Sequence, residues 1–152
     1  MTLSKLTYRY LSIIFASIAF ISNYCFEFSK KLDMERLMDK AVDFSSISFG
    51  FLLAVLALLL QNNSPALQRI IDNDKFQELI DFNKKSVIAS AVLAIAAIIY
   101  IASRLYISTW VLLNKLSVRL VSDSICLSIF TFQLVQVILF LDLFYFIIKQ
   151  KE

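Results

Sequence analysis

Glycine, proline and histidine are almost missing from this 152-residue chain, which has one Gly, one Pro and no His. Turn-rich β architectures and phosphate-binding loops both need glycine, because it adopts backbone conformations that other residues rarely do. The missing histidine removes the imidazole base of a nucleophilic triad and the commonest metal ligand. The sequence therefore predicts long helices, and it indicates no enzyme, no catalytic residue, no cofactor and no metal site.

Cysteine is also scarce. Cys25 and Cys126 lie in separate apolar runs, far from any paired metal-ligand spacing. We expect two buried free thiols, which is the usual state of unpaired Cys. The net charge of +3 is small and evenly spread, so it does not indicate a nucleic-acid partner.

Apolar residues are what the chain has in excess: 59% of it is hydrophobic, and its mean hydropathy is +0.75. A soluble domain of this size buries only about two thirds of its unfolded surface, so the remaining apolar surface needs lipid or protein to cover it. We predict an all-α, polytopic integral membrane protein of about four transmembrane helices, with residues 1–152 forming a single membrane domain.

Four apolar runs match the length that a helix needs to cross a bilayer, or nearly so. The predicted spans are about 11–26, 44–60, 86–103 and 124–148. Basic residues precede the first run, as in a signal peptide, but the residues before Cys25 do not form a cleavage site. We therefore interpret the first run as a retained span.

The segments between the spans carry their own helical patterns. Within residues 27–43, apolar side chains recur at helical spacing from Met34 to Ala41, which predicts a short amphipathic helix on the membrane surface. Residues 61–85 predict a helical hairpin extension outside the membrane. In it a short helix begins at Ser64-Pro65, and a long one begins near Lys75.

Packing within this hairpin is predicted from its apolar side chains. Phe76, Leu79 and Ile80 would pack on the short helix of the hairpin, away from the spans. Residues 105–121 are ambiguous, because leucines share one face and basic residues another. We favour an interfacial helix anchored by Trp110 over a fifth span.

Basic residues give the orientation. Eight Lys and Arg lie on the side of the two termini and seven on the other, so the bias is small. Lys84, Lys85, Lys149 and Lys151 lie close to span ends. This favours both termini in the cytoplasm and a multi-pass protein of the inner cell membrane.

Small residues at helical spacing predict where helices pack in lipid. The predicted packing positions are Ser46, Gly50 and Ala54 in the second span, and Ser86, Ser90 and Ala94 in the third. We expect these two faces to meet each other or a neighbouring subunit.

Polar residues inside the spans are the candidate functional positions. Ser128, Thr131 and Asp142 share a stripe on the fourth span and are candidates to line a pore, whereas Gln133 and Gln136 lie outside it. A carboxylate in a membrane helix handles ions or protons, or pairs with another helix or the headgroups, and both alternatives stay open for Asp142. Asn23 in the first span is a further polar candidate, and we interpret it as a hydrogen bond between helices.

The span order, the Ser46–Phe51 start of the second span and a short charged hairpin containing Arg69 carry a resemblance. The chain resembles the small four-span membrane proteins of phage exclusion and antiviral defence systems, such as the Rex-type membrane component of phage lambda. That resemblance implies an effector that damages or depolarises the host membrane on infection, with a separate partner that senses the infection.

Three functional hypotheses follow. The first is an oligomeric, membrane-perturbing or ion-conducting effector, since four short spans enclose too little protein for a private path. The second is a non-conducting accessory, anchor or immunity subunit that binds a cytosolic partner protein through residues 61–85. Its candidate contacts are Arg69, Lys75, Lys84 and Lys85. The third is a small secondary transporter, although the first span lacks a membrane-embedded Glu. In each case the partners include the lipid bilayer, and for the effector a second copy of the chain.

Overall fold

The computed structural model describes residues 3–61, 74–107, 111–112 and 116–149, and side chains over 10–58, 79–103 and 118–145. This part of the chain forms four long helices: α1 (Leu3–Phe26), α2 (Met34–Gln61), α4 (Asp74–Ile107) and α5 (Val118–Lys149). A short 3-10 helix, η1 (Phe28–Lys30), follows α1. Two-residue strands β1 (Val111–Leu112) and β2 (Leu116–Ser117) pair antiparallel. The predicted all-α class is confirmed.

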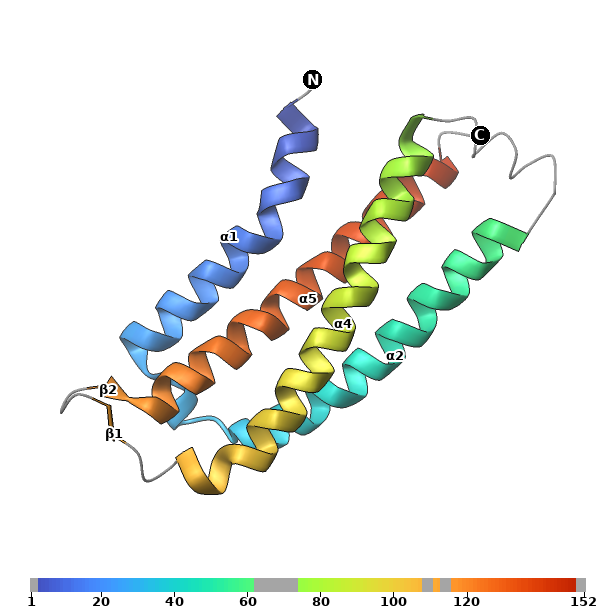
Figure 1. The fold of residues 1–152 in the computed structure, drawn as a ribbon. Coiled ribbons are helices and arrows are strands. Elements are labelled where there is room, and N and C mark those ends of the chain that lie inside the picture. Colours follow the sequence, from blue (N-terminus) through green and yellow to red (C-terminus); the bar gives the residue numbers. More distant parts are fainter. Residues whose placement is uncertain (1–2, 62–73, 108–110, 113–115, 150–152) are drawn as a thin grey trace.

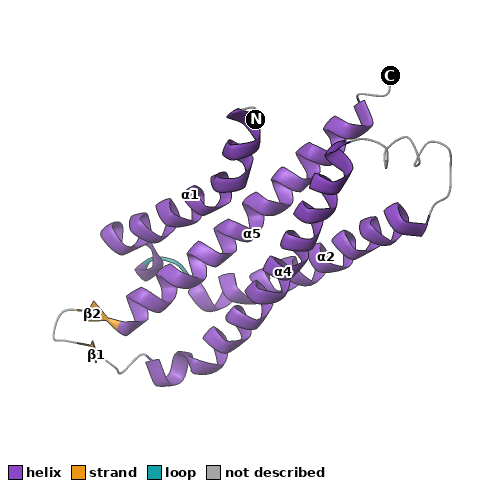
Figure 2. Cartoon of the chain, turned by 45° about the horizontal axis from the view of Figure 1, so that its top comes forward, coloured by secondary structure: helices purple, strands orange, loops and turns teal. Residues whose placement is uncertain are grey.

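The four helices alternate in direction. Figure 1 shows the starts of α1 and α4 at one end of the bundle together with the ends of α2 and α5, and the β pair lies at the opposite end. The spatial order differs from the chain order: α5 packs between α1 and α4, and α2 packs mainly on α4 (Figure 2). The last helix is therefore central in the bundle.

Three helices of the described chain are long and apolar enough to cross a membrane, over Met34–Leu58, Leu79–Ser103 and Val118–Tyr145. The apolar part of α1, Tyr10–Phe26, is shorter. The outer surface of all four helices carries aliphatic side chains that no other part of the bundle covers, such as Ile47, which is 73% exposed. Such a continuous apolar surface is stable in hydrocarbon rather than in water. The protein is a helical membrane protein.

Two apolar clusters hold α2, α4 and α5 together. One lies near the end of α2, and its buried members are Leu52, Val55, Leu79, Phe82, Leu139 and Phe140. The other lies near the start of α2, and its buried members are Met34, Met38, Ala41, Leu93, Ala97, Tyr100 and Cys126. Close packing of this kind is the main attraction between helices in lipid.

The corner after α1 is fixed by Asn23. Its carbonyl oxygen accepts a hydrogen bond from the Glu27 N–H at 2.8 Å, and Glu27 adopts a left-handed conformation (φ 53°) that ends the helix. The side chain of Asn23 accepts from the Ser29 N–H and donates to the Ser124 hydroxyl on α5, each at 2.8 Å. The predicted hydrogen bond between helices is confirmed, and it ties the corner to α5.

Residues 34–43 belong to α2 and do not form a separate surface helix, so that prediction is wrong. No helix-breaking residue separates them from the second span, and α2 continues without interruption from Met34 to Gln61. Their apolar face is used inside the protein, because Met34, Met38 and Ala41 are fully buried. The amphipathic pattern was real, but protein rather than the membrane surface covers its apolar side.

The predicted interfacial helix over 105–121 is also wrong. Residues up to Ile107 complete α4, Val111 pairs with Ser117, and α5 begins at Val118. Leucines at helical spacing do not outweigh the need for the chain to reverse between two antiparallel helices. Trp110, the proposed anchor, lies outside the described residues.

The hairpin extension is confirmed in one part and corrected in another. The long helix predicted to start near Lys75 is α4, which begins at Asp74. Leu79 does not pack outside the bundle as expected, because it is buried against Leu52 and Phe140. The reason is that α2 reaches Gln61 and lies beside this part of α4. The predicted short helix at residues 64–71 lies outside the described residues.

Candidate functional site

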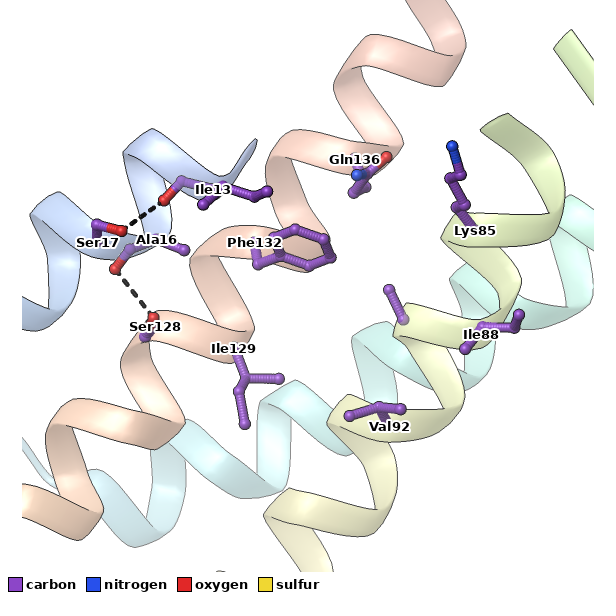
Figure 3. Close-up of a pocket in the computed structure, with 11 residues that line it drawn as sticks. Ile13, Ala16, Ser17, Lys85, Ile88, Val92, Ser128, Ile129, Phe132 and Gln136 are labelled. Atoms are coloured by element: carbon purple, nitrogen blue, oxygen red, sulfur yellow. Dashed lines mark hydrogen bonds between the residues drawn. The ribbon is translucent and has the colours of Figure 1, made fainter. Parts of the chain in front are cut away.

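The predicted pore-lining residues do not share one surface in a single copy. The Ser128 hydroxyl donates to the Ala16 carbonyl oxygen of α1 at 2.9 Å (Figure 3), and the Thr131 hydroxyl donates to Leu127 of its own helix at 2.8 Å. Asp142 is exposed on the outer surface. The stripe therefore contacts α1 at one end and faces away from the bundle at the other.

The two predicted packing faces do not meet. Ser46, Gly50 and Ala54 are exposed on α2, and a side chain added at Gly50 would contact nothing within 4 Å. On α4, by contrast, Ser86 and Ser90 are buried and Ala94 is half-buried. Larger apolar side chains decide which face of α2 is inside. Contact of the exposed α2 face with a neighbouring subunit stays a prediction.

The candidate partner-binding lysines can be placed only in part. Lys84 and Lys85 are exposed near the start of α4. Arg69 and the side chain of Lys75 lie outside the described residues. The cytosolic-partner hypothesis therefore stays a prediction.

Sequence reasoning missed a row of buried polar side chains between α4 and its neighbours. We call it the polar row; its members are Asn83, Ser86, Ser90, Gln133 and Gln136. The Gln133 amide donates to the Ser90 hydroxyl, which donates to the Ser86 carbonyl oxygen at 3.0 Å. The Asn83 amide donates to the Leu52 carbonyl oxygen of α2, also at 3.0 Å. From Asn83 to Ser90 the row extends about 10 Å along α4.

Several oxygen atoms of the polar row have no hydrogen-bond partner among the described residues. They are Asn83 Oδ1, Ser86 Oγ, Gln133 Oε1 and Gln136 Oε1, all fully buried. An unpaired buried polar atom costs about 1–3 kcal/mol. The row therefore provides acceptor positions where a water molecule or a cation would be stabilised.

Within one copy, the polar row ends at an apolar layer on the side toward the end of α4. Ser90 faces Gln133, and ten residues farther along α4 the Tyr100 hydroxyl donates to Asp123 at 2.5 Å. Asp123 is ten residues from Gln133 on α5, so both contacts fit one antiparallel register. Between them lies the apolar layer, formed by Leu93, Ala97 and Cys126, which are all buried. Polar groups thus flank this layer on both sides. Beyond the polar row, toward the start of α4, the interface is apolar again, because Leu79 and Phe82 pack with Leu139 and Phe140.

The sequence contained a signal for the polar row. Asn83, Ser86 and Ser90 recur at spacings of three and four residues, and Gln133 and Gln136 are three apart. Each set therefore lies on one helical face. Helical periodicity places both glutamines outside the serine stripe of their own helix, and their relation to α4 depends on the pairing of the two helices.

The two cysteines differ in burial. Cys126 is buried as expected, whereas Cys25, near the end of α1, is exposed, so that half of the prediction is wrong. Both are free thiols. Within the described residues no group of three Cys, Asp or Glu side chains is placed to hold a metal ion.

Comparison with known proteins gives no relative. No protein-family model matches the chain, and no curated protein or solved structure is similar to it.

Proposed function

We propose that this protein is an oligomeric membrane effector that makes its bilayer permeable to ions. The observation that carries the proposal is the polar row, with its unpartnered oxygen atoms buried between membrane helices. Buried Asn, Gln and Ser side chains commonly join membrane helices by hydrogen bonds. The oxygen atoms of this row that no such bond uses are what favour a role in ion passage, because unpaired polar atoms are costly in a membrane. Amide and hydroxyl oxygens suit a hydrated cation that passes briefly.

The proposed effector is closed at rest. The apolar layer separates the polar row from the Tyr100–Asp123 contact over about 15 Å of α4. An apolar constriction stops ions because water leaves it. Opening then requires a rearrangement of α4 against α5, and such a step suits a protein that acts only when triggered.

Self-association supplies the protein mass that one copy lacks. The exposed small residues Ser46, Gly50 and Ala54 allow close approach of a second α2. The conducting path would then form where several copies meet, with the polar row reoriented toward it.

Ion flux in liposomes tests the proposal. Purified protein in potassium-loaded vesicles should collapse an imposed potential, measured with a potential-sensitive dye. Replacing Gln133 and Gln136 by Leu should lower the rate roughly thirtyfold or more, because each of the two lost polar partners in a dry path costs about 1–3 kcal/mol. Thr131→Val is the matched control, since Thr131 bonds only within its own helix among the described contacts.

The apolar layer provides a test in the opposite direction. Leu93→Asn should raise the resting flux, because a polar side chain there lets water enter the layer. A wild-type protein that leaves the potential unchanged, with Leu93→Asn equally silent, would contradict conduction. That result would favour a non-conducting accessory or anchor that binds a partner protein.

The biological setting we propose is the inner cell membrane, with both termini in the cytoplasm and a role in antiviral defence. The resemblance to phage exclusion proteins supports this setting. Cells that express the chain should lose membrane potential after phage infection and yield fewer phage than cells with the Gln133/Gln136 double variant. Equal phage yields from both strains would contradict the defence role while leaving the liposome result standing.

A further inference from the structure

A groove on the outside of the bundle lies between α1 and α4, with α5 as its floor, and it shares only Gln136 with the polar row. It has a volume of about 550 Å³. The groove exists because α1 and α4 both pack on α5 from opposite sides. Its walls are mainly apolar, and Figure 3 shows Ile13, Ile88, Val92, Ile129 and Phe132 around it.

Two polar groups gather at one end of this groove. Figure 3 shows Lys85 of α4 and Gln136 of α5 there, with Val92 and Ile129 toward the other end. Gln136 is only 6% exposed, and its Oε1 has no partner among the described residues. No described carboxylate forms an ion pair with Lys85.

The other polar groups of the groove are already satisfied. The Ser17 hydroxyl donates to the Ile13 carbonyl oxygen at 2.8 Å, and the Ser128 hydroxyl donates to Ala16 at 2.9 Å. The groove therefore offers one cation and one amide at its polar end and apolar contact elsewhere. This is the pattern of a site for an amphiphile.

The depth of the groove in the membrane agrees with that pattern. Lys85 lies six residues into the apolar stretch Leu79–Ser103, about 9 Å from its start, where a long side chain reaches the headgroups. Val92 lies about 10 Å deeper along α4. A lipid with its headgroup at Lys85 would place its acyl chain beside Val92 and Ile129.

We propose that this groove binds one anionic phospholipid, with its phosphate at Lys85 and Gln136 and an acyl chain along the apolar walls. The Lys85 ammonium and the Gln136 amide N–H would both donate to phosphate oxygens. The unpartnered Gln136 Oε1 can only accept, so its partner would be a donor such as a hydroxyl of the lipid headgroup. A helix of a second copy is a poorer occupant, because a helix about 10 Å across takes roughly 800 Å³ over 10 Å of its length. The inference needs only membrane insertion and is independent of ion conduction.

Native mass spectrometry of the full-length protein, equilibrated with phosphatidylglycerol and phosphatidylcholine together, tests the proposal. The wild type should retain one phosphatidylglycerol in preference to phosphatidylcholine. Lys85→Gln should reduce this preference roughly fivefold, the effect of one basic residue near an anionic lipid surface. Lys85→Arg should preserve it, and Gln136→Leu should weaken it.

Neighbouring charges provide matched controls. Lys84→Gln removes the same charge from an exposed residue that does not line the groove, so it should have little effect. Asp81 is exposed one turn before Lys85, and Asp81→Asn should leave retention unchanged or raise it. Equal losses from Lys84→Gln and Lys85→Gln would overturn the proposal, because they would indicate general attraction to a basic surface.

A bulky side chain locates the acyl chain. Val92 is exposed toward the groove, so Val92→Trp should fill the deep end without disturbing the core. Phosphatidylglycerol retention should fall while the helix content by circular dichroism stays the same. Full retention by Val92→Trp would overturn the proposal. So would loss of a dimer with lipid still bound, since the occupant would then be a second copy.

Discussion

At the scale of single residues, buried polar side chains fix which helices pack together, which apolar packing alone does not specify. Asn23 is the clearest case, since its backbone and side chain contact Glu27, Ser29 and Ser124 at once. In lipid such hydrogen bonds specify which helices meet and in which register. Each of these contacts can be tested by a single substitution.

Asn23→Leu should destabilise the protein by about 1–2 kcal/mol. It removes the side-chain hydrogen bonds that join the end of α1 to Ser29 and to Ser124 of α5. Unfolding in mixed micelles of mild detergent and SDS, followed by circular dichroism, measures the change. Ser17→Ala is the control, since among the described contacts the exposed Ser17 hydroxyl bonds only to Ile13 of its own helix. Equal unfolding midpoints for the two variants would contradict the role assigned to Asn23.

The Tyr100–Asp123 contact should behave as a coupled pair. Tyr100→Phe and Asp123→Asn should each lower stability, and the double variant should lose less than the sum of the two. The coupling expected of a buried hydrogen bond to a carboxylate is about 1–2 kcal/mol. The same unfolding assay, applied to the wild type, the two single variants and the double variant, completes this double-mutant cycle. Strictly additive losses would show that the two side chains do not interact in the membrane.

At the scale of elements, the continuity of α2 replaces two predicted helices, one on the membrane surface and one across it, by a single helix. The charged segment after α1 and the second span are one rod, whose buried face contacts α4 and α5 from the first residues onward. The helix therefore passes from a charged surface region into the hydrocarbon of the membrane without a break in its backbone. Its length then becomes a direct observable.

Spin labels at Arg36 and Ala54, both exposed, should lie about 27 Å apart along α2 because they are eighteen residues apart. A surface helix joined at a right angle near Phe44 would give roughly 19 Å. Pulsed electron resonance on a protein with both cysteines replaced distinguishes these values. Labels at Ile125 and Leu143, eighteen residues apart in α5, provide the control distance.

At the scale of the whole molecule, the alternating helices place Cys25 and Cys126 in different surroundings. Cys25 is exposed beside Glu27, at the end of the bundle that holds the β pair, whereas Cys126 is buried among α2 and α4. A thiol reagent therefore reports both the packing and the orientation of the molecule.

A membrane-impermeant maleimide added to intact cells should label Cys25 much faster than Cys126. This follows from burial, and labelling from outside follows from the proposed cytoplasmic termini. Variants with a single cysteine measure each rate, and inverted vesicles provide the opposite side. Faster labelling of Cys25 in inverted vesicles than in intact cells would show that the orientation is opposite to the proposed one. Equal labelling rates at both cysteines in membranes without denaturant would contradict the burial of Cys126.

The sequence by itself determined the class of protein. Scarce Gly and Pro, together with long apolar runs, leave helices in lipid as the arrangement that satisfies every backbone group. The absence of a helix-breaking residue between Lys75 and Ser103 also predicted α4 nearly to its first residue. These properties are local, because they depend on residues near one another in the chain.

Only the tertiary structure decided which faces meet. Each span carries several polar or small stripes, and helical periodicity cannot tell which of them a neighbour covers. The arrangement of α5 between α1 and α4 directs Ser128 to α1 and Gln133 to Ser90. It also leaves Ser46, Gly50 and Ala54 outside. The polar row and the lipid groove are both products of that pairing, which depends on contacts more than 40 residues apart in the chain.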